Sequence, residues 1–356
     1  MQAELLRERF AAARAAGRRA RDAAADIGVS EGEAVAAHAG LAGGPLRAVP
    51  LRGPWIELLR ALEPCGPLLA LTRNASTVHE KTGVYRKLSA DGGVGLALGG
   101  EIDLRLFFDR WHAGFAVTEE PAQAANPPTH SLQFYDAAGQ AVHKIYLREG
   151  SDREAFALAS ARFAAAAQQY AFRPEPPKAA PRPDELVDAR ALGAAWAAMT
   201  DTHQFFGMLR SLGVERQQSF RLMQDRFAWR AAPGALRTLL QEAAFDGLPI
   251  MVFVGSPGCI QIHTGPVQRI EPMEVRGAQW LNVLDPGFNL HLREDRVANA
   301  WIVEKPTSDG VVTSVEAFDG DGELMAMFFG ARKPGAPELE RWRELVRELP
   351  RHEGAA

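Results

Sequence analysis

Cysteine is scarce in this chain, with only Cys65 and Cys259 among 356 residues and no CxxC pair or zinc-ligand spacing. Two isolated thiols exclude a disulfide framework and favour a reducing compartment. We expect both side chains to be small, buried apolar groups. No run approaches the roughly 18 apolar residues that cross a bilayer, and the Ala- and Arg-rich N-terminus lacks the apolar stretch of a secretory signal. These absences predict a cytoplasmic protein without membrane insertion.

The chain also lacks a large excess of positive or negative charge. The formal net charge of -4 gives no overall attraction to nucleic acid or to an anionic membrane. The chain has no G-x-G-x-x-G motif, no phosphate loop and no Ser-His-Asp arrangement with a local signature. Hydrophobic residues make up 47% and charged residues 24%, which is typical of a globular protein. The length suits two domains, or one domain and its copy.

An internal repeat is the strongest feature that is present. Three blocks recur in the same order at nearly constant spacing, which indicates a tandem duplication. The paired blocks are HEKTGVY (79–85) with QIHTGPV (261–267), IDLRLFFDR (102–110) with FNLHLREDR (288–296), and SLQFYDAAGQ (131–140) with SVEAFDGDGE (314–323).

The repeat predicts an α+β fold of two similar halves, each an antiparallel β-sheet with flanking helices. We place the halves at 1–171 and 186–356, joined by the proline-rich linker 172–185. A ligand cleft is expected between them. Alternation and β-branched or aromatic residues predict the elements of the first half. These are strands at 67–73, 93–108, 114–119, 130–136 and 141–147, a hairpin turn at 136–140, and a helix at 152–170. A helix near 234–244 and a second strand series from 249 to 330 follow in the second half.

The N-terminal segment 3–37 has the outline of a helical hairpin. Strong helix formers occupy 3–26, the GVS sequence then interrupts them, and Ser30 with Glu33 forms a capping box for a further helix. A helix-turn-helix with a DNA-binding role is one alternative. We favour a hairpin packed on the neighbouring domain, because no recognition surface follows Ser30 and the net charge is negative.

His203 is the most informative single residue. Leu192, Trp196, Met199 and His203 follow one another at helical steps, which predicts one apolar helix face that carries an imidazole. Such a face suits haem, although a histidine of this kind is often a core residue bonded to a carbonyl. Asp201 and Gln204 also resemble a capping box, so that a new helix can begin here with His203 in its first turn.

Several cations accompany this histidine. Arg105 shares a predicted sheet face with Phe107, and the two side chains could cover one face of a flat ligand. Arg105 could then donate hydrogen bonds to a bound water or O2. Lys305 and Arg332 lie at strand ends, where they could pair with ligand carboxylates. Solvated surface positions are the alternative for each of them.

Long, ordered motifs over nearly the whole chain resemble the bacterial HemS/ChuS-type hemin-degrading and haem-trafficking family. The motifs are RNASTVHEKTGVY, LGGEIDLRLFFDRWHAGFAV, MTDTHQFFGMLR, GSPGCIQIHTGPV, NVLDPGFNLHLRED and KPTSDGVVTSVEAFDGDGELMAMFFGARKPG.

The resemblance implies a role for each residue of the site. His203 would be the axial ligand of the haem iron, and Arg105 and Phe107 would lie on the distal face. The propionates would meet Arg216, Lys305 and Arg332, and His79 matches a secondary haem contact. The chain departs from some relatives at Phe329, where they have Tyr, so the tyrosine hydrogen bond to a propionate is absent.

The predicted function is haem uptake and iron acquisition in the cytoplasm. The protein would bind haem b and degrade it oxidatively with electrons from an external donor, because no flavin or nicotinamide motif is visible. The alternative is a haem chaperone that passes its cargo to a separate haem oxygenase. An inner-membrane haem importer is the other implied partner.

Overall fold

The structure is a computed structural model that describes residues 3–121, 127–333 and 335–352. The chain divides into two compact units. Unit 1 comprises Met1–Asn74, Val78–Pro176 and Gly255–Gln261, and unit 2 comprises Ala75–Thr77, Pro177–Val254 and Ile262–Ala356. Each unit therefore includes a short segment from the other half of the sequence. Among the described residues, no helix is long and apolar enough to cross a membrane.

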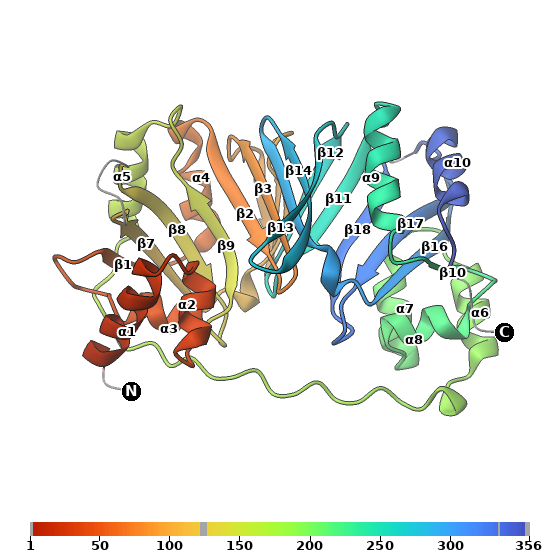
Figure 1. Cartoon of the computed structure of the whole chain (residues 1–356), viewed down its shortest axis with the longest axis horizontal. Coiled ribbons are helices and arrows are strands. Elements are labelled where there is room, and N and C mark those ends of the chain that lie inside the picture. Colours follow the sequence, from red (N-terminus) through yellow and green to blue (C-terminus); the bar gives the residue numbers. More distant parts are fainter. Residues whose placement is uncertain (1–2, 122–126, 334, 353–356) are drawn as a thin grey trace. The chain divides into compact units, whose positions relative to one another are not determined.

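Unit 1 combines an antiparallel sheet with short helices (Figure 1). Its elements are α1 (Ala3–Ala15), α2 (Ala20–Asp26), α3 (Glu31–Ala36), β1 (Leu46–Leu51), α4 (Trp55–Arg60), β2 (Leu68–Arg73), β3 (Thr77–Gly83), β4 (Leu88–Asp91), β5 (Val94–Leu98), β6 (Asp103–Phe107), β7 (Ala113–Glu119), β8 (Thr129–Tyr135), β9 (Ala141–Tyr146) and α5 (Arg153–Arg162). Single 3₁₀ turns lie at Glu63–Cys65 and Phe108–Arg110. The main strand order is β1-β7-β8-β9-β2-β3, and β4, β5 and β6 form a separate antiparallel ladder.

The N-terminal helices pack on the sheet of unit 1. Phe10 of α1, Ala24 of α2 and Val35 of α3 are buried in one cluster with Phe115 of β7. The predicted capping box is present, because the Ser30 hydroxyl accepts from the Glu33 N–H while the Glu33 carboxylate accepts from the Ser30 N–H. Since α3 buries most of its surface here, the hairpin serves packing, as the sequence favoured.

Two predictions for unit 1 need correction: the strand expected over 93–108 is two strands, β5 and β6, and the helix expected over 152–170 is shorter. The helix expected over 152–170 ends at Arg162, because the next residues run beside β1: the Ala165 N–H donates to the Pro50 carbonyl at 2.8 Å. Strand β1 itself was not predicted. It contains Pro50, which interrupts the β pattern and is tolerated at a sheet edge.

Unit 2 repeats this plan with longer strands. Its elements are α6 (Ala189–Ala197), α7 (Gln204–Leu212), α8 (Arg216–Leu222), β10 (Ala228–Ala231), α9 (Ala235–Phe245), β11 (Ile250–Gly255), β12 (Cys259–Gly265), β13 (Ile270–Val275), β14 (Ala278–Asp285), β15 (Phe288–Arg293), β16 (Asn299–Thr307), β17 (Gly310–Phe318), β18 (Leu324–Gly330) and α10 (Glu340–Glu348). Single 3₁₀ turns lie at Asp184–Leu186 and Glu294–Arg296. The strands β10-β16-β17-β18-β11 form one antiparallel run and β15-β14-β13 another.

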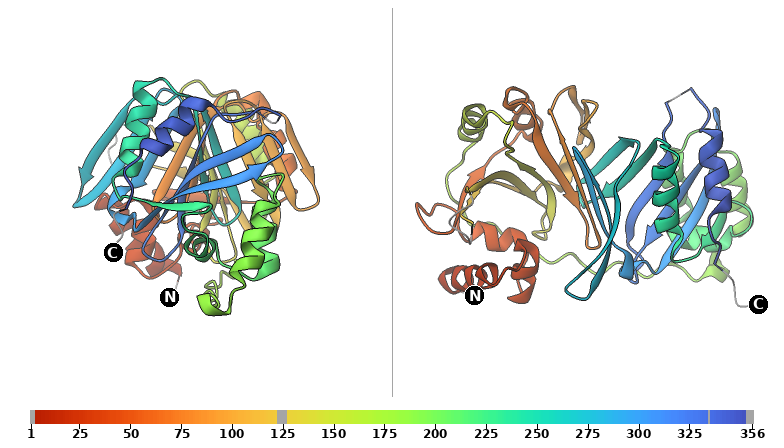
Figure 2. Two further views of the ribbon diagram at one scale, coloured as in Figure 1. Left: turned by 90° about the vertical axis from the view of Figure 1, so that its right-hand side faces the viewer. Right: turned by 45° about the horizontal axis from the view of Figure 1, so that its top comes forward.

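The sheet of unit 2 separates two apolar layers. Helices α9 and α10 cover one face, where Leu239 and Trp342 pack with Ile302 of β16. Helices α6, α7 and α8 cover the other face, where Trp196 and Phe220 pack with Trp301. Figure 2 shows these two helical layers on opposite sides of the blue strands. Neighbouring residues of β16 therefore serve different layers, as strand alternation requires.

The structure confirms the duplication, and matched residues play matched parts. Asp136 follows β8 and its carboxylate accepts from the N–H groups of Ala138 and Gln140. Asp319 follows β17 and accepts in the same way from Asp321 and Glu323. The two cysteines are unpaired and buried, as the sequence predicted.

Candidate functional site

The predicted single helix through His203 is wrong. Helix α6 ends at Ala197 and α7 begins at Gln204, and the chain turns between them. Leu192, Trp196 and Met199 are buried, as their spacing indicated. The His203 side chain instead is 91% exposed, at the N-cap of α7. The second interpretation, a new helix that starts at this point, is the one that holds.

Polar contacts of Asp201 and Gln204 define the start of α7. The Gln204 carbonyl oxygen accepts from the Thr200 N–H at 2.9 Å and from the Asp201 N–H at 3.3 Å. The Asp201 carboxylate accepts from the His203 N–H at 2.8 Å. These bonds pair backbone N–H groups of the turn that leads into α7.

The imidazole of His203 is held by one of its nitrogens. Its Nδ1 lies 2.6 Å from Oδ1 of Asp201. The backbone N–H of His203, then its ring, lower the pKa of the Asp201 carboxyl, and the charge of Arg332 adds to this effect. An ionised carboxylate only accepts hydrogen bonds, so Nδ1 carries a proton, and in the neutral form of the ring Nε2 has the lone pair that can bind a ligand.

Two phenylalanines lie in the first turn of α7, next to His203 in the sequence. Phe206 is 70% exposed, which is unusual for a large aromatic residue. Phe205 is buried and packs edge-on against Trp196, with 4.7 Å between the ring centroids. The first turn of α7 therefore carries one buried and one exposed aromatic ring.

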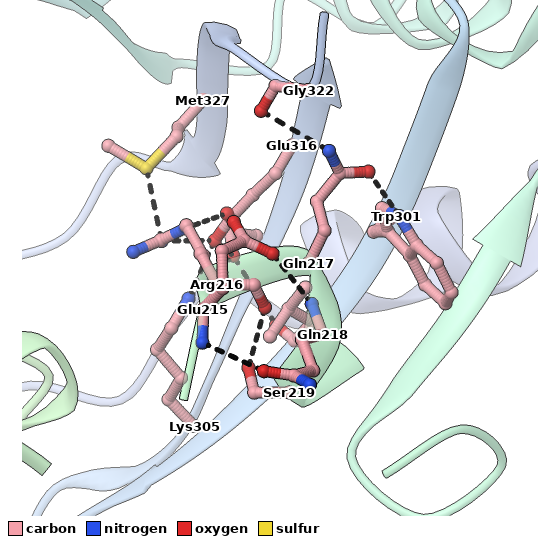
Figure 3. Close-up of polar contacts among 12 residues, drawn as sticks. Glu215, Arg216, Gln217, Gln218, Ser219, Trp301, Lys305, Glu316, Gly322 and Met327 are labelled. Carbon is pink, nitrogen blue, oxygen red and sulfur yellow. Dashed lines mark hydrogen bonds and ion pairs between the residues drawn. The ribbon is translucent and has the colours of Figure 1, made fainter. Parts of the chain in front are cut away.

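A second cluster joins Arg216, Lys305 and Glu316 (Figure 3). Arg216 donates from Nε and Nη2 to the two oxygens of Glu316 at 2.7 and 2.8 Å. Lys305 donates to the same carboxylate at 2.8 Å and to the Ser314 hydroxyl at 3.0 Å. A capping box between Glu215 and Gln218 fixes the start of α8 and so directs Arg216.

The charges of this cluster do not cancel. Glu316 is fully buried, which raises its pKa, but Arg216 and Lys305 outweigh burial and hold it well below the usual range. Burial lowers the pKa of Lys305, although Glu316 opposes that shift. Two cations therefore share one carboxylate. Both also lie over the Phe205 ring, at 5.1 Å for Arg216 and 5.0 Å for Lys305, which links the cluster to α7.

Arg332 follows β18 and is near the His203 turn. Its guanidinium donates to the Ala336 carbonyl at 3.2 Å and lies 3.9 Å from the Asp309 carboxylate. Its charge acts on Asp201, as noted above. The Ser308 N–H donates to the Thr200 carbonyl at 2.9 Å, so the turn after β16 is tied to the segment before α7. Unit 2 therefore holds His203 and the predicted propionate cations in one body.

The remaining predicted residues belong to unit 1. Arg105 and Phe107 lie on the partly exposed face of β6, while Leu104 and Leu106 are buried, as alternation predicted. Arg105 forms an ion pair with Asp103. His79 is fully buried in β3, opposite Thr72 of β2. Its role as a secondary haem contact stays a prediction.

Comparison with known proteins identifies the family. The haemin-degrading HemS.ChuX domain matches twice, at residues 28–163 and 213–349. The hemin transport protein HmuS of Yersinia pestis is 38% identical over 94% of this chain and 93% of its own length. The chain belongs to the HemS/ChuX domain family. This membership confirms the resemblance inferred from the motifs.

Solved structures of HemS-like proteins agree with the fold. The holo form of PhuS, a heme-binding protein from Pseudomonas aeruginosa, is 45% identical, with a TM-score of 0.92 over 99% of this chain and all of that one. ChuS, described as an Escherichia coli heme oxygenase, is 35% identical, with a TM-score of 0.85 over 97% of this chain and 99% of that one.

Two residues that contact the predicted site residues escaped the sequence reasoning. Glu316 lies in a repeat block, SVEAFDGDGE, yet nothing in a strand pattern marks a buried glutamate as a partner for Arg216 and Lys305. Asp201 was noticed only as a helix cap. The signal that could have identified its second role is the D-x-H spacing, which brings a carboxylate to the ring nitrogen when a helix begins at the next residue.

Proposed function

We propose that this protein binds haem through Nε2 of His203 and serves haem uptake and iron acquisition. The observation that carries the proposal is an exposed imidazole whose other nitrogen is fixed by a carboxylate, on an aromatic helix surface. A neutral histidine of this kind is a common axial ligand of haem iron. The names of the relatives, hemin transport protein, heme-binding protein and heme oxygenase, agree with it.

The cations of unit 2 suit the acidic edge of haem. Arg216 and Lys305 share a single carboxylate, so the cluster has one positive charge in excess. Arg216 keeps a quarter of its side chain exposed, whereas Lys305 is buried. We therefore assign the direct propionate contact to Arg216 and Arg332. Lys305 would act chiefly by adding charge behind Arg216.

We further propose that bound haem is degraded oxidatively. Haem supplies the O2 chemistry once an external donor delivers electrons, and the chain supplies orientation and access. Arg105 would donate hydrogen bonds on the distal side, and Phe107 would pack against the ring. Asp103 competes for Arg105, because the two side chains form an ion pair.

A non-catalytic chaperone is the second candidate. The relatives named as transport proteins favour it, and a carrier needs the same axial histidine and propionate cations. In this case a separate haem oxygenase would receive the haem. Under either function we propose a cytoplasmic location and supply by an inner-membrane haem importer.

One experiment separates the two functions. Protein loaded with one equivalent of hemin receives a reductant in air, with catalase present to remove free peroxide, and absorption spectra follow the Soret band. The variant His203→Ala is compared with His352→Ala, which removes another exposed histidine of unit 2. A parallel sample contains an added haem oxygenase.

The outcomes are distinct. Decay of the Soret band to a defined tetrapyrrole in wild type and His352→Ala, but not in His203→Ala, supports the enzyme. Intact haem that moves to the added oxygenase supports the chaperone. If His203→Ala binds haem with the wild-type spectrum, the axial assignment is wrong.

A further inference from the structure

Asp201 makes a pair of short hydrogen bonds to one residue. A single oxygen, Oδ1, accepts from the ring Nδ1 of His203 at 2.6 Å and from its backbone N–H at 2.8 Å. The same residue thus fixes both the backbone and the ring. Because the ring proton is on Nδ1, the lone pair of Nε2 points away from the carboxylate.

The carboxylate is itself held in place. Gln204 accepts from the N–H groups of Thr200 and Asp201 and donates to the Thr200 hydroxyl at 3.2 Å. Ser308, in the turn between β16 and β17, donates to the Thr200 carbonyl. The segment before α7 is therefore tied at both ends, which preorganises Asp201 before any ligand binds.

Packing does not orient the imidazole. With 91% of its side chain exposed, His203 lacks the neighbours that fix a buried ring. Within the described part of the chain, Asp201 is the group that hydrogen-bonds to this imidazole. An exposed ring without such a bond would sample several rotamers and lose entropy on binding.

We propose that Asp201 is a positioning residue for the haem ligand: it orients the His203 imidazole, fixes its tautomer and increases the electron density at Nε2. The proposal rests on the proposed function, in which Nε2 binds iron. A carboxylate partner makes a histidine a stronger ligand, and loss of such a partner typically lowers metal affinity about 10- to 100-fold. A more basic imidazole also favours ferric over ferrous iron.

The test is a graded series at position 201. Asn keeps an oxygen that accepts from Nδ1 but removes the charge, whereas Ala removes both. Wild type, Asp201→Asn and Asp201→Ala are loaded with hemin, and Asp246→Asn, which alters a surface ion pair of unit 2, is the matched control. Three quantities are measured: the rate of haem transfer to a high-affinity acceptor protein, the iron–histidine stretching frequency of the ferrous form, and the haem reduction potential.

We expect haem transfer to become about 10- to 100-fold faster in Asp201→Ala, with an intermediate rate in Asp201→Asn. The stretching frequency should fall and the reduction potential should rise in the same order. A role in folding alone would change the rate without moving the frequency or the potential. If both stay at their wild-type values in Asp201→Ala, the proposal is overturned.

His203→Ala separates this proposal from the one on which it rests. If that variant keeps the wild-type axial signature, the axial assignment fails and Asp201 has no ligand to position. If it loses the signature while the Asp201 variants keep theirs, only the role of Asp201 is rejected.

Discussion

Glu316 is a fully buried carboxylate whose charge is balanced by Arg216 and Lys305. Removal of one partner from a buried ion pair leaves the remaining charge buried and uncompensated, which costs about 3–5 kcal/mol. We therefore expect Glu316→Gln to lower the free energy of unfolding by about this amount, measured by urea denaturation of the haem-free protein.

A suitable control for Glu316 is Glu271, which forms an exposed ion pair with Arg269 in the same unit. Glu271→Gln should change stability by no more than about 1 kcal/mol, as exposed ion pairs do. Equal losses in the two variants would mean that burial does not distinguish these carboxylates.

His143 predicts a pH dependence of stability. Its Nε2 lies 2.7 Å from the Tyr85 hydroxyl and its Nδ1 lies 2.9 Å from the Thr72 hydroxyl, and burial lowers its pKa to about 3. The unfolded chain binds a proton near pH 6.5, whereas the folded protein does not until about pH 3. The contribution of neutral, buried His143 to stability is thus complete above about pH 6.5, and it is lost as the pH falls toward 3.

The variant His143→Gln keeps hydrogen-bonding groups but cannot titrate. Between about pH 6 and pH 4, wild type should lose about 1.4 kcal/mol per pH unit relative to this variant. Urea denaturation at several pH values measures the difference. Parallel pH profiles would show that His143 is protonated within the folded protein.

At the scale of single residues, the sequence singled out positions that repeat a known motif, and their roles at haem stay predictions. His203, Arg216, Lys305 and Arg332 lie in one unit. Their partners were not predictable, because Asp201 and Glu316 acquire their roles from where a helix begins and from which strand faces α8. The site therefore became complete only in three dimensions.

At the scale of elements, helix α3 packs closely against the β8–β9 turn. The Gly32 N–H donates to the Gly139 carbonyl at 2.9 Å. A methyl group on Gly139 would lie 2.0 Å from the Ser30 hydroxyl oxygen, and its φ of +75° already disfavours other residues. We expect Gly139→Ala to disturb the docking of α3 and its capping box.

Gly28 provides the control for Gly139, because its φ is +76° and no atom lies within 4 Å of an added methyl group. Gly28→Ala should cost about 1–2 kcal/mol from backbone strain. Gly139→Ala should cost about 1–3 kcal/mol more, because of overpacking. Thermal or urea unfolding measures both, and similar values would show that α3 adjusts freely.

The elements were the most predictable level of the fold. Strands with alternating burial, such as β6 and β15, and the helix cap at Ser30 follow from local patterns. Errors arose where tertiary contacts override them. The Ala-rich stretch after Arg162 has helical propensity, but hydrogen bonds to β1 hold its start extended.

At the scale of the whole molecule, the duplication produced two unequal repeats. The first residue of α3 is Glu31, which forms a buried ion pair with Lys144 at 2.5 Å. The first residue of α8 is Arg216, and its contact at the matching strand position is Met327, 3.5 Å away. The charge of Glu31 is neutralised within its own repeat, whereas Arg216 remains part of a cluster with excess positive charge.

The same asymmetry extends along the paired strands. The repeat blocks align Gln133 with Glu316. Gln133 forms hydrogen bonds with the hydroxyl groups of Ser131 and Tyr135, whereas Glu316 forms ion pairs with two cations. The first repeat also lacks a counterpart of the THQFF sequence that carries His203. A fold that is duplicated need not contain a duplicated site, and here the proposed axial histidine and propionate cations occur in unit 2.

We therefore expect one haem per chain. Titration of the protein with hemin, followed at the Soret band, should saturate at one equivalent, and His203→Ala should lose this high-affinity binding. A variant of the first repeat, Lys144→Met, should reduce stability because Glu31 loses its buried partner, yet leave the stoichiometry and the axial spectrum unchanged. Two equivalents of similar affinity, or a halved stoichiometry in Lys144→Met, would show that the first repeat also binds haem.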